Sequence, residues 1–181
     1  QVEHPVTEMV TGIDLIKAQI AVAAGQPLPF KQEDIRMTGH ALECRINAED
    51  PVSFRPMPGT IREFVAPGGL HVRWDSHVYA GYRIPSTYDS MIGKLIVHGK
   101  DRDEAVAIML RALDEMVVAG DGVKTIIPLH RDLLMNARVQ SGDVHTGFVE
   151  QFIASQEHLA GGTRRSMNAE PTPCSTARRP A

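Results

Sequence analysis

The stretch from residue 40 to residue 99 alternates short strand-like segments with turn-forming residues, and this spacing limits the folds open to the chain. In GHALECRINAE, residues 40, 42, 44 and 46 would share one face and residues 41, 43, 45 and 47 the other, which is typical of a half-buried strand. Further strand candidates are TIREFVAP, LHVRWDSHV, YRIPSTYD and SMIGKLIVHG, and the Pro-Gly-Gly at 67–69 marks a turn. Closely spaced strands of this kind predict an antiparallel sheet or a small barrel.

Helical patterns flank this region on both sides. Apolar residues recur at helical spacing between Ile13 and Ile20, and Gly25 ends the pattern, which predicts a helix over 11–24. A short turn of helix is expected before it, with Gly12 at the joint. The segment 101–120 carries a long apolar stripe and begins with an acidic capping box, so it is the strongest helix candidate. Helices around an antiparallel sheet place the chain in the α+β class.

Composition excludes several classes of function. The 19 basic and 22 acidic side chains give a net charge of −3, so no basic surface for nucleic acid is expected. No apolar run approaches the ~18 residues of a membrane span. The two cysteines, Cys44 and Cys174, form no disulfide framework, which favours a reducing cytoplasm. We expect Cys44 to be a small buried apolar residue.

Common phosphate and metal motifs are missing from the sequence. It contains no G-x-x-x-x-G-K-[ST] loop and no G-x-G-x-x-G turn, so no phosphate cradle is visible. It contains no C-x-x-C, H-E-x-x-H or EF-hand pattern either. Candidate chemistry therefore has to come from clusters of polar residues.

The first such cluster opens the chain. His4 precedes Pro5, and a residue before proline avoids the helical region, so His4 is predicted to be extended. Gln1 and Glu3 would then point to the same side, where an amide and a carboxylate can bind and deprotonate a small oxyanion. A frayed terminus with exposed polar groups is the alternative, and spacing alone favours it.

Two further clusters lie on the strand candidates. Glu43, Arg45 and Asn47 share one strand face, where the arginine would present a fixed fork to an oxyanion or enolate. An ordinary surface ladder with a salt bridge explains the same pattern. The polar residues of YDSMIGKLI, Lys94 among them, either line a pocket or flank the strand, and the pattern does not choose between these.

Four segments together resemble one family. QVEHPVTEMVTGIDL, GHALECRINAEDP, APGGLHVRWDSHVYAGY and YDSMIGKLIVHG closely resemble biotin carboxylase, the ATP-grasp component of acetyl-CoA carboxylase and of its pyruvate and propionyl-CoA counterparts. The similarity runs in order from Gln1 to about Phe152. It implies the end of an ATP-grasp domain over 1–31, then the biotin carboxylase C-terminal domain over 32–155, mostly antiparallel or barrel-like sheet with packed helices. Residues 156–181 are expected to be a disordered tail.

The resemblance also implies an activity. Biotin carboxylase carboxylates biotin on a carrier protein with ATP and bicarbonate, through carboxyphosphate, in the first half-reaction of acetyl-CoA or a related carboxylase. In that family QVEHPVTE lies inside the chain, so this sequence is expected to be the C-terminal part of such an enzyme. The ligands of ATP and of Mg²⁺ or Mn²⁺ would lie mostly outside it, and no metal ligand is expected within it.

Roles for single residues follow from the same resemblance. Gln1 and the Val2 backbone match groups that hold bicarbonate, and Glu3 matches a bicarbonate-binding general base. Arg45 matches the arginine that stabilises the biotin enolate. A prepositioned cation of this kind lowers the barrier where negative charge develops.

Partners are implied as well. Arg73 matches a residue of the family's homodimer interface, and Leu70 stands where some members carry an aromatic residue. A biotin carboxyl carrier protein or domain and a carboxyltransferase are the other expected partners, in a cytoplasmic enzyme of fatty acid or related metabolism. The alternative is a non-catalytic dimerisation or regulatory module that lacks the ATP site, and ATP binding by this chain alone would discriminate between the two.

Overall fold

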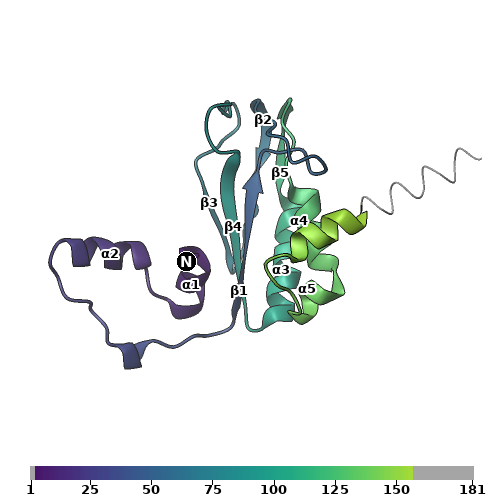
Figure 1. Ribbon diagram of the computed structural model, residues 1–181. Coiled ribbons are helices and arrows are strands. Elements are labelled where there is room, and N and C mark those ends of the chain that lie inside the picture. Colours follow the sequence, from purple (N-terminus) through teal and green to yellow (C-terminus); the bar gives the residue numbers. More distant parts are fainter. Residues whose placement is uncertain (1–2, 157–181) are drawn as a thin grey trace, which may run out of the picture. The chain divides into compact units, whose positions relative to one another are not determined.

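The computed structural model describes residues 3–156, and a three-stranded antiparallel sheet lies at its centre (Figure 1). Strands β1 (His40–Asn47), β4 (Met91–Gly99) and β3 (Val72–Ser76) follow one another across the sheet in that order. Along β1, Cys44 and Ile46 are buried while the residue between them is exposed. The predicted strand over this segment, with one apolar and one polar face, is therefore confirmed, as is the antiparallel arrangement.

A second, two-stranded antiparallel sheet joins β2 (Thr60–Val65) to β5 (Val117–Asp121). The sequence pattern predicted helix throughout 101–120, and that prediction is wrong after Glu115. Met116 has extended backbone angles, and the two valines that follow pair with the end of β2. The apolar residues after Glu115 fit both the helical period and the strand period. Pairing with β2 makes this segment a strand.

Helix α3 (Arg102–Glu115) covers one face of the central sheet, against β4 and β1. Its start is as predicted, because the Asp101 side chain accepts a hydrogen bond of 2.9 Å from the backbone N–H of Glu104. The helix contributes its apolar stripe to the hydrophobic core together with the inward residues of β1 and β4. The helical residues buried in this way are Ala105, Val106, Met109, Ala112 and Leu113.

The chain begins with two helices, α1 (His4–Thr11) and α2 (Leu15–Ala23). His4 was predicted to be extended, and this is wrong, since it is the first residue of α1. Proline is tolerated in a first helical turn, where its missing N–H has no partner to lose, and Glu3 takes the extended N-cap position instead.

A glycine separates these helices, as predicted for a short turn of helix that meets the next helix at Gly12, although the second helix begins at Leu15 and not at residue 11. Gly12 ends α1 with a φ of 71°, a left-handed conformation that glycine adopts without strain. The Asp14 side chain then caps α2 by accepting a hydrogen bond from the Lys17 backbone. Helix α1 packs against β1 and β4 on the opposite side of the sheet from α3 (Figure 1).

Three further helical elements are short: η1 (Gln32–Asp34), α4 (Ile127–Met135) and α5 (Ala137–Ser141). The strand predicted at YRIPSTYD is wrong. Arg83 forms a single isolated bridge to Thr60, and Pro85 has no N–H to donate to a ladder.

The chain divides into two compact units, residues 1–143 and 144–181. Of the second, residues 144–156 are described, and 148–156 are helical. The predicted disordered tail lies outside the described residues apart from residue 156, and the domain boundaries given above stay predictions. No helix within residues 3–156 combines the length and apolarity needed to cross a membrane.

Gly93 in the middle of β4 leaves room for an indole ring. A Cβ at this position would lie 2.3 Å from the Trp74 ring, which packs beside Phe64 on the core. We expect Gly93→Ala to lower the free energy of unfolding by about 1–3 kcal/mol, the usual cost of overpacking. Gly68→Ala is the control, because its Cβ would meet nothing within 4 Å. Equal urea midpoints for the two variants would contradict this packing.

Candidate functional site

Four charged side chains meet on the face of the sheet that α1 covers. Glu3 lies 2.5 Å from the Arg45 guanidinium through Oε1 and 3.2 Å from Lys94 Nζ through Oε2. Glu43 Oε1 in turn lies 3.7 Å from Arg45 Nε and 3.5 Å from Lys94 Nζ. Each acid therefore contacts both bases, and each base contacts both acids. We call these four residues the charge ring.

Strand register explains how the charge ring assembles. Arg45 of β1 stands directly opposite Lys94 of β4, and Glu43 precedes Arg45 by two residues on the same strand face. Glu3 arrives from the N-cap of α1, which packs over these two strands. The sequence places the acid 42 residues before its arginine, so only the fold brings the two together.

Burial differs around the charge ring. Glu43 and Lys94 expose 7% and 16% of their side chains, whereas Glu3 and Arg45 expose 36% and 51%. The inner pair is thus largely shielded from water, and the outer pair faces solvent. Solvent therefore reaches Glu3 and Arg45 more readily than Glu43 and Lys94.

Electrostatics keep the outer acid ionised. Hydrogen bonds from Arg45 and then Lys94 hold the pKa of the Glu3 carboxyl below its ordinary value. The carboxylate is therefore present at neutral pH, which is the form that a base requires. Cys44 lies next to the charge ring in sequence but points into the core, and burial raises the pKa of its thiol to about 12. The expectation that Cys44 is a buried apolar residue is confirmed.

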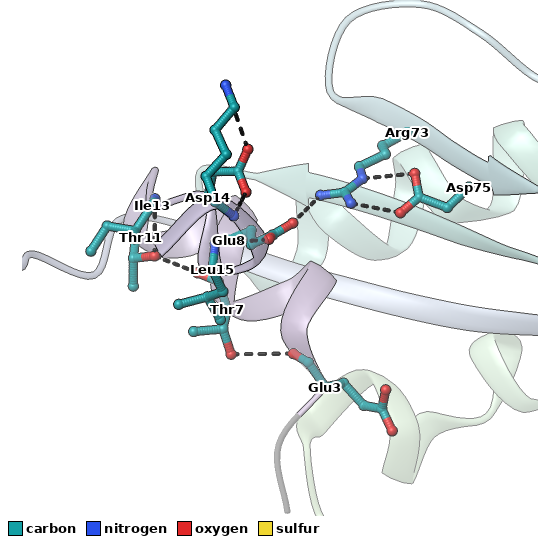
Figure 2. A network of polar contacts seen from close by, with 10 residues as sticks. Glu3, Thr7, Glu8, Thr11, Ile13, Asp14, Leu15, Arg73 and Asp75 are labelled. Carbon is teal, nitrogen blue, oxygen red and sulfur yellow. Dashed lines mark hydrogen bonds and ion pairs between the residues drawn. The ribbon is translucent and has the colours of Figure 1, made fainter. Parts of the chain in front are cut away.

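A second network fixes α1 to the edge strand β3 (Figure 2). Arg73 donates to Glu8 at 2.6 Å and, through two nitrogens, to Asp75 at 2.9 and 2.6 Å. The other oxygen of Glu8 accepts from the Leu15 backbone N–H at the start of α2. Figure 2 shows the Glu3 carboxylate pointing away from this network, so the two sets of charges are separate.

The residues expected at a dimer interface differ in their surroundings. Arg73 exposes 32% of its side chain and is engaged within the chain by Glu8 and Asp75. Leu70 is 80% exposed, just before β3. An apolar side chain so exposed on an edge is available to a partner, and its role in dimerisation stays a prediction.

The other polar candidates separate in the structure. Asn47 donates to Glu49 at 3.0 Å and to Ser90 at 3.3 Å, and Ser90 also donates to Glu49. Lys94 is part of the charge ring. Tyr88 is 81% exposed and does not line a pocket with it.

The sequence pattern singled out Glu43 and Lys94 in two separate clusters. The register of the antiparallel pair β1–β4 joins them, and no local pattern in either segment gives that register.

Metal ligation finds no support in the described part of the chain. Residues 3–156 contain no group of three His, Cys, Asp or Glu side chains arranged to hold a metal ion. Gln1 and Val2, expected to bind bicarbonate, lie outside the described residues. In the described residues, Glu3 and Arg45 place a carboxylate beside a guanidinium, and Glu43 and Lys94 form a second ion pair next to them.

The fold and the site define an α+β domain that presents a glutamate carboxylate and an arginine on one face of an antiparallel sheet. Residues 43–151 match the family model described as biotin carboxylase C-terminal domain. The chain belongs to the biotin carboxylase C-terminal domain family. Residues 1–31 match a second model, described as the ATP-binding domain of the carbamoyl-phosphate synthase L chain.

Curated relatives agree with this assignment. The biotin carboxylase of Haemophilus influenzae is 54% identical over 157 residues, which is 87% of this chain and 35% of that protein. Biotin carboxylase 1 of Bacillus subtilis is 56% identical over 153 residues, which is 84% of this chain and 34% of that protein. The chain thus spans about a third of the length of these relatives.

Solved structures carry the same fold. The biotin carboxylase domain dimer of Hydrogenobacter thermophilus 2-oxoglutarate carboxylase, in complex with MgADP, ADP and bicarbonate, matches with a TM-score of 0.79 and 45% identity. The match covers 83% of this chain and 33% of that one. The expected resemblance to biotin carboxylase, and the α+β fold that it implied, are confirmed.

Proposed function

We propose that this chain supplies the bicarbonate base and the enolate-stabilising arginine of an ATP-dependent biotin carboxylase. The contact between Glu3 and Arg45 carries the proposal. These residues are far apart in sequence, yet Glu3 Oε1 lies 2.5 Å from a guanidinium nitrogen of Arg45. One is a carboxylate held ionised, and the other is a planar cation exposed to solvent. Similarity to biotin carboxylases over most of the chain supports the reaction class.

Glu3 takes the first proton in the proposed reaction. Bicarbonate is a poor nucleophile, and transfer of its proton to the Glu3 carboxylate frees an oxygen to attack the γ-phosphorus of ATP. A bond forms between that oxygen and phosphorus while the bond to ADP breaks. The product, carboxyphosphate, splits into CO₂ and phosphate. Gln1 and the Val2 backbone are proposed to hold bicarbonate for this step.

Arg45 acts on the second substrate. Phosphate released beside the ureido ring of biotin takes the ring N–H proton, and negative charge then develops on the ureido oxygen. The Arg45 guanidinium can donate to that oxygen with its planar fork and lower the energy of the enolate, which then attacks CO₂. ATP and its divalent metal ion are proposed to be held mainly by residues beyond those described.

Assembly is the finer part of the proposal. The biotin is expected on a carrier protein or domain, and a carboxyltransferase would consume the carboxybiotin, in a cytoplasmic enzyme of fatty acid or related metabolism. A second copy of the chain is proposed to contact the edge that carries Leu70 and Arg73. The exposed Leu70 side chain supports this surface, since apolar groups of that size gain from burial at a protein interface.

Label transfer tests the function directly. The full-length protein, incubated with ¹⁴C-bicarbonate, ATP, Mg²⁺ and free biotin, is expected to form acid-labile labelled carboxybiotin only when ATP is present. The 181-residue chain alone, titrated with ATP by calorimetry, is expected to show no binding. Absence of label transfer by a folded full-length protein would overturn the proposal and favour the non-catalytic module.

A further inference from the structure

Two of the four residues of the charge ring have no role in the proposed reaction. Glu3 and Arg45 have roles in it, whereas Glu43 and Lys94 have none. Yet these two are the least exposed members of the charge ring, at 7% and 16% of their side chains. Removing a charged side chain from water has a desolvation free energy, and ion pairs with good geometry are needed to offset it.

Glu3 and Arg45 bind each other, yet the proposed function, on which this inference rests, requires each of them to contact a substrate. In the structure, Glu3 Oε1 and the Arg45 guanidinium neutralise one another at 2.5 Å. Arg45 must turn toward the ureido oxygen of biotin to stabilise the enolate, and Glu3 must turn toward bicarbonate. Both side chains are partly exposed, so without further contacts each would become mobile once their mutual ion pair opened.

The inner pair removes that conflict. Lys94 Nζ lies 3.2 Å from Glu3 Oε2, the oxygen that Arg45 does not use, and Glu43 Oε1 lies 3.7 Å from Arg45 Nε. When the outer ion pair opens, Glu3 therefore keeps one cation and Arg45 keeps one anion. Lys94 and Glu43 also hold each other at 3.5 Å.

We propose that Lys94 and Glu43 are positioning residues that hold Glu3 and Arg45 in place while the ion pair between those two opens for substrate. Both sit on paired strands of the central sheet, which makes them rigid supports. Low exposure leaves their contacts less screened by salt than a surface pair. The α1 N-cap and the sheet would otherwise be joined at Glu3 by Arg45 alone.

The other charged side chains on the elements around Glu3 have partners of their own or adjoin it in sequence. On α1, Glu8 is taken up by Arg73, and His4 adjoins Glu3 in sequence. On β3, Asp75 stands opposite Lys94 in the strand register and is held by Arg73. The cations that contact Glu3 in the described residues are then Arg45 and Lys94.

The first test replaces Lys94 in the full-length protein. We expect Lys94→Met to lower kcat/KM for bicarbonate in bicarbonate-dependent ATP cleavage by about 10-fold, part of what a positioned base contributes, with KM for ATP unchanged. The acid limb of the pH profile should move to higher pH, because Glu3 loses a cation and its pKa rises. Lys94→Arg should restore most of the rate. Lys124→Met, which removes an exposed lysine paired with Asp50, is the matched control.

A second readout does not depend on catalysis. Carboxyl ¹³C NMR of the protein, with the Glu3 signal assigned from Glu3→Gln, follows the titration of Glu3 itself. We expect its midpoint to rise in Lys94→Met, because Glu3 loses a cation, and to rise less in Lys94→Met/Glu43→Gln, because that variant also loses a nearby anion. The double variant shows in addition whether the protein folds when neither inner charge is left buried alone. An unchanged midpoint in folded Lys94→Met would overturn the proposal. If the wild-type protein forms no carboxybiotin, the proposed function fails, and the titration of Glu3 still decides the role of Lys94.

Discussion

Arg45→Ala is expected to lower the rate of biotin carboxylation by about 10²–10³-fold, the usual effect of removing one preorganised donor from a developing oxyanion. Bicarbonate-dependent ATP cleavage without biotin should fall much less, because Arg45 acts after carboxyphosphate has formed. Arg45→Lys should recover part of the loss, since it keeps the charge and loses the planar fork. Parallel assays of carboxybiotin and phosphate formation measure both rates.

Arg62→Ala is the matched control for this experiment. Arg62 is also an exposed strand arginine in an ion pair, with Asp121 at 2.7 Å, but it lies on β2 and outside the charge ring. We expect it to retain the wild-type rates. Normal biotin carboxylation by Arg45→Ala would show that the role proposed for Arg45 is wrong.

Glu3→Gln is expected to have the other large effect. The amide has nearly the shape of the carboxylate but cannot accept a proton, so bicarbonate-dependent ATP cleavage should fall by about 10²–10⁴-fold, the range of general base catalysis. The rate of the wild-type protein should also fall as the pH drops through the pKa of Glu3. Because Arg45 and Lys94 lower that pKa, the loss should occur at more acidic pH than for an ordinary glutamate.

The control for Glu3→Gln is Glu33→Gln. Glu33 lies in η1, where it is 3.9 Å from Lys31 and largely exposed, so its replacement should leave ATP cleavage unchanged. Bicarbonate-dependent cleavage at the wild-type rate in Glu3→Gln, with the protein folded, would exclude Glu3 as the base.

Local sequence patterns predicted the parts of the fold whose signals are local. The alternation from His40 to Asn47 and the Asp101 cap depend on neighbours within a few residues, and both are confirmed. The patterns failed where a distant partner decides, as at β5, whose valines pair with β2. They also failed at His4, since a preference against helix before proline is weaker than the gain from completing a first helical turn over the sheet.

The candidate site shows the same division. Strand periodicity could place Glu43 and Arg45 on one face, but it could not indicate that Lys94 stands opposite Arg45, because register between separate strands is set by tertiary packing. Spacing alone favoured an exposed terminus for Glu3. The contacts of Glu3 with Arg45 and Lys94 come from α1 lying on the sheet, which no local pattern encodes.

We propose that this chain belongs to an enzyme that activates bicarbonate through carboxyphosphate. The most direct test supplies ¹⁸O-labelled bicarbonate and ATP to the full-length protein and measures the phosphate released by mass spectrometry. Because the attacking bicarbonate oxygen stays on phosphorus when carboxyphosphate splits, we predict one ¹⁸O atom in each phosphate formed. Phosphate without ¹⁸O would mean that water attacks ATP, and that would contradict the proposed mechanism.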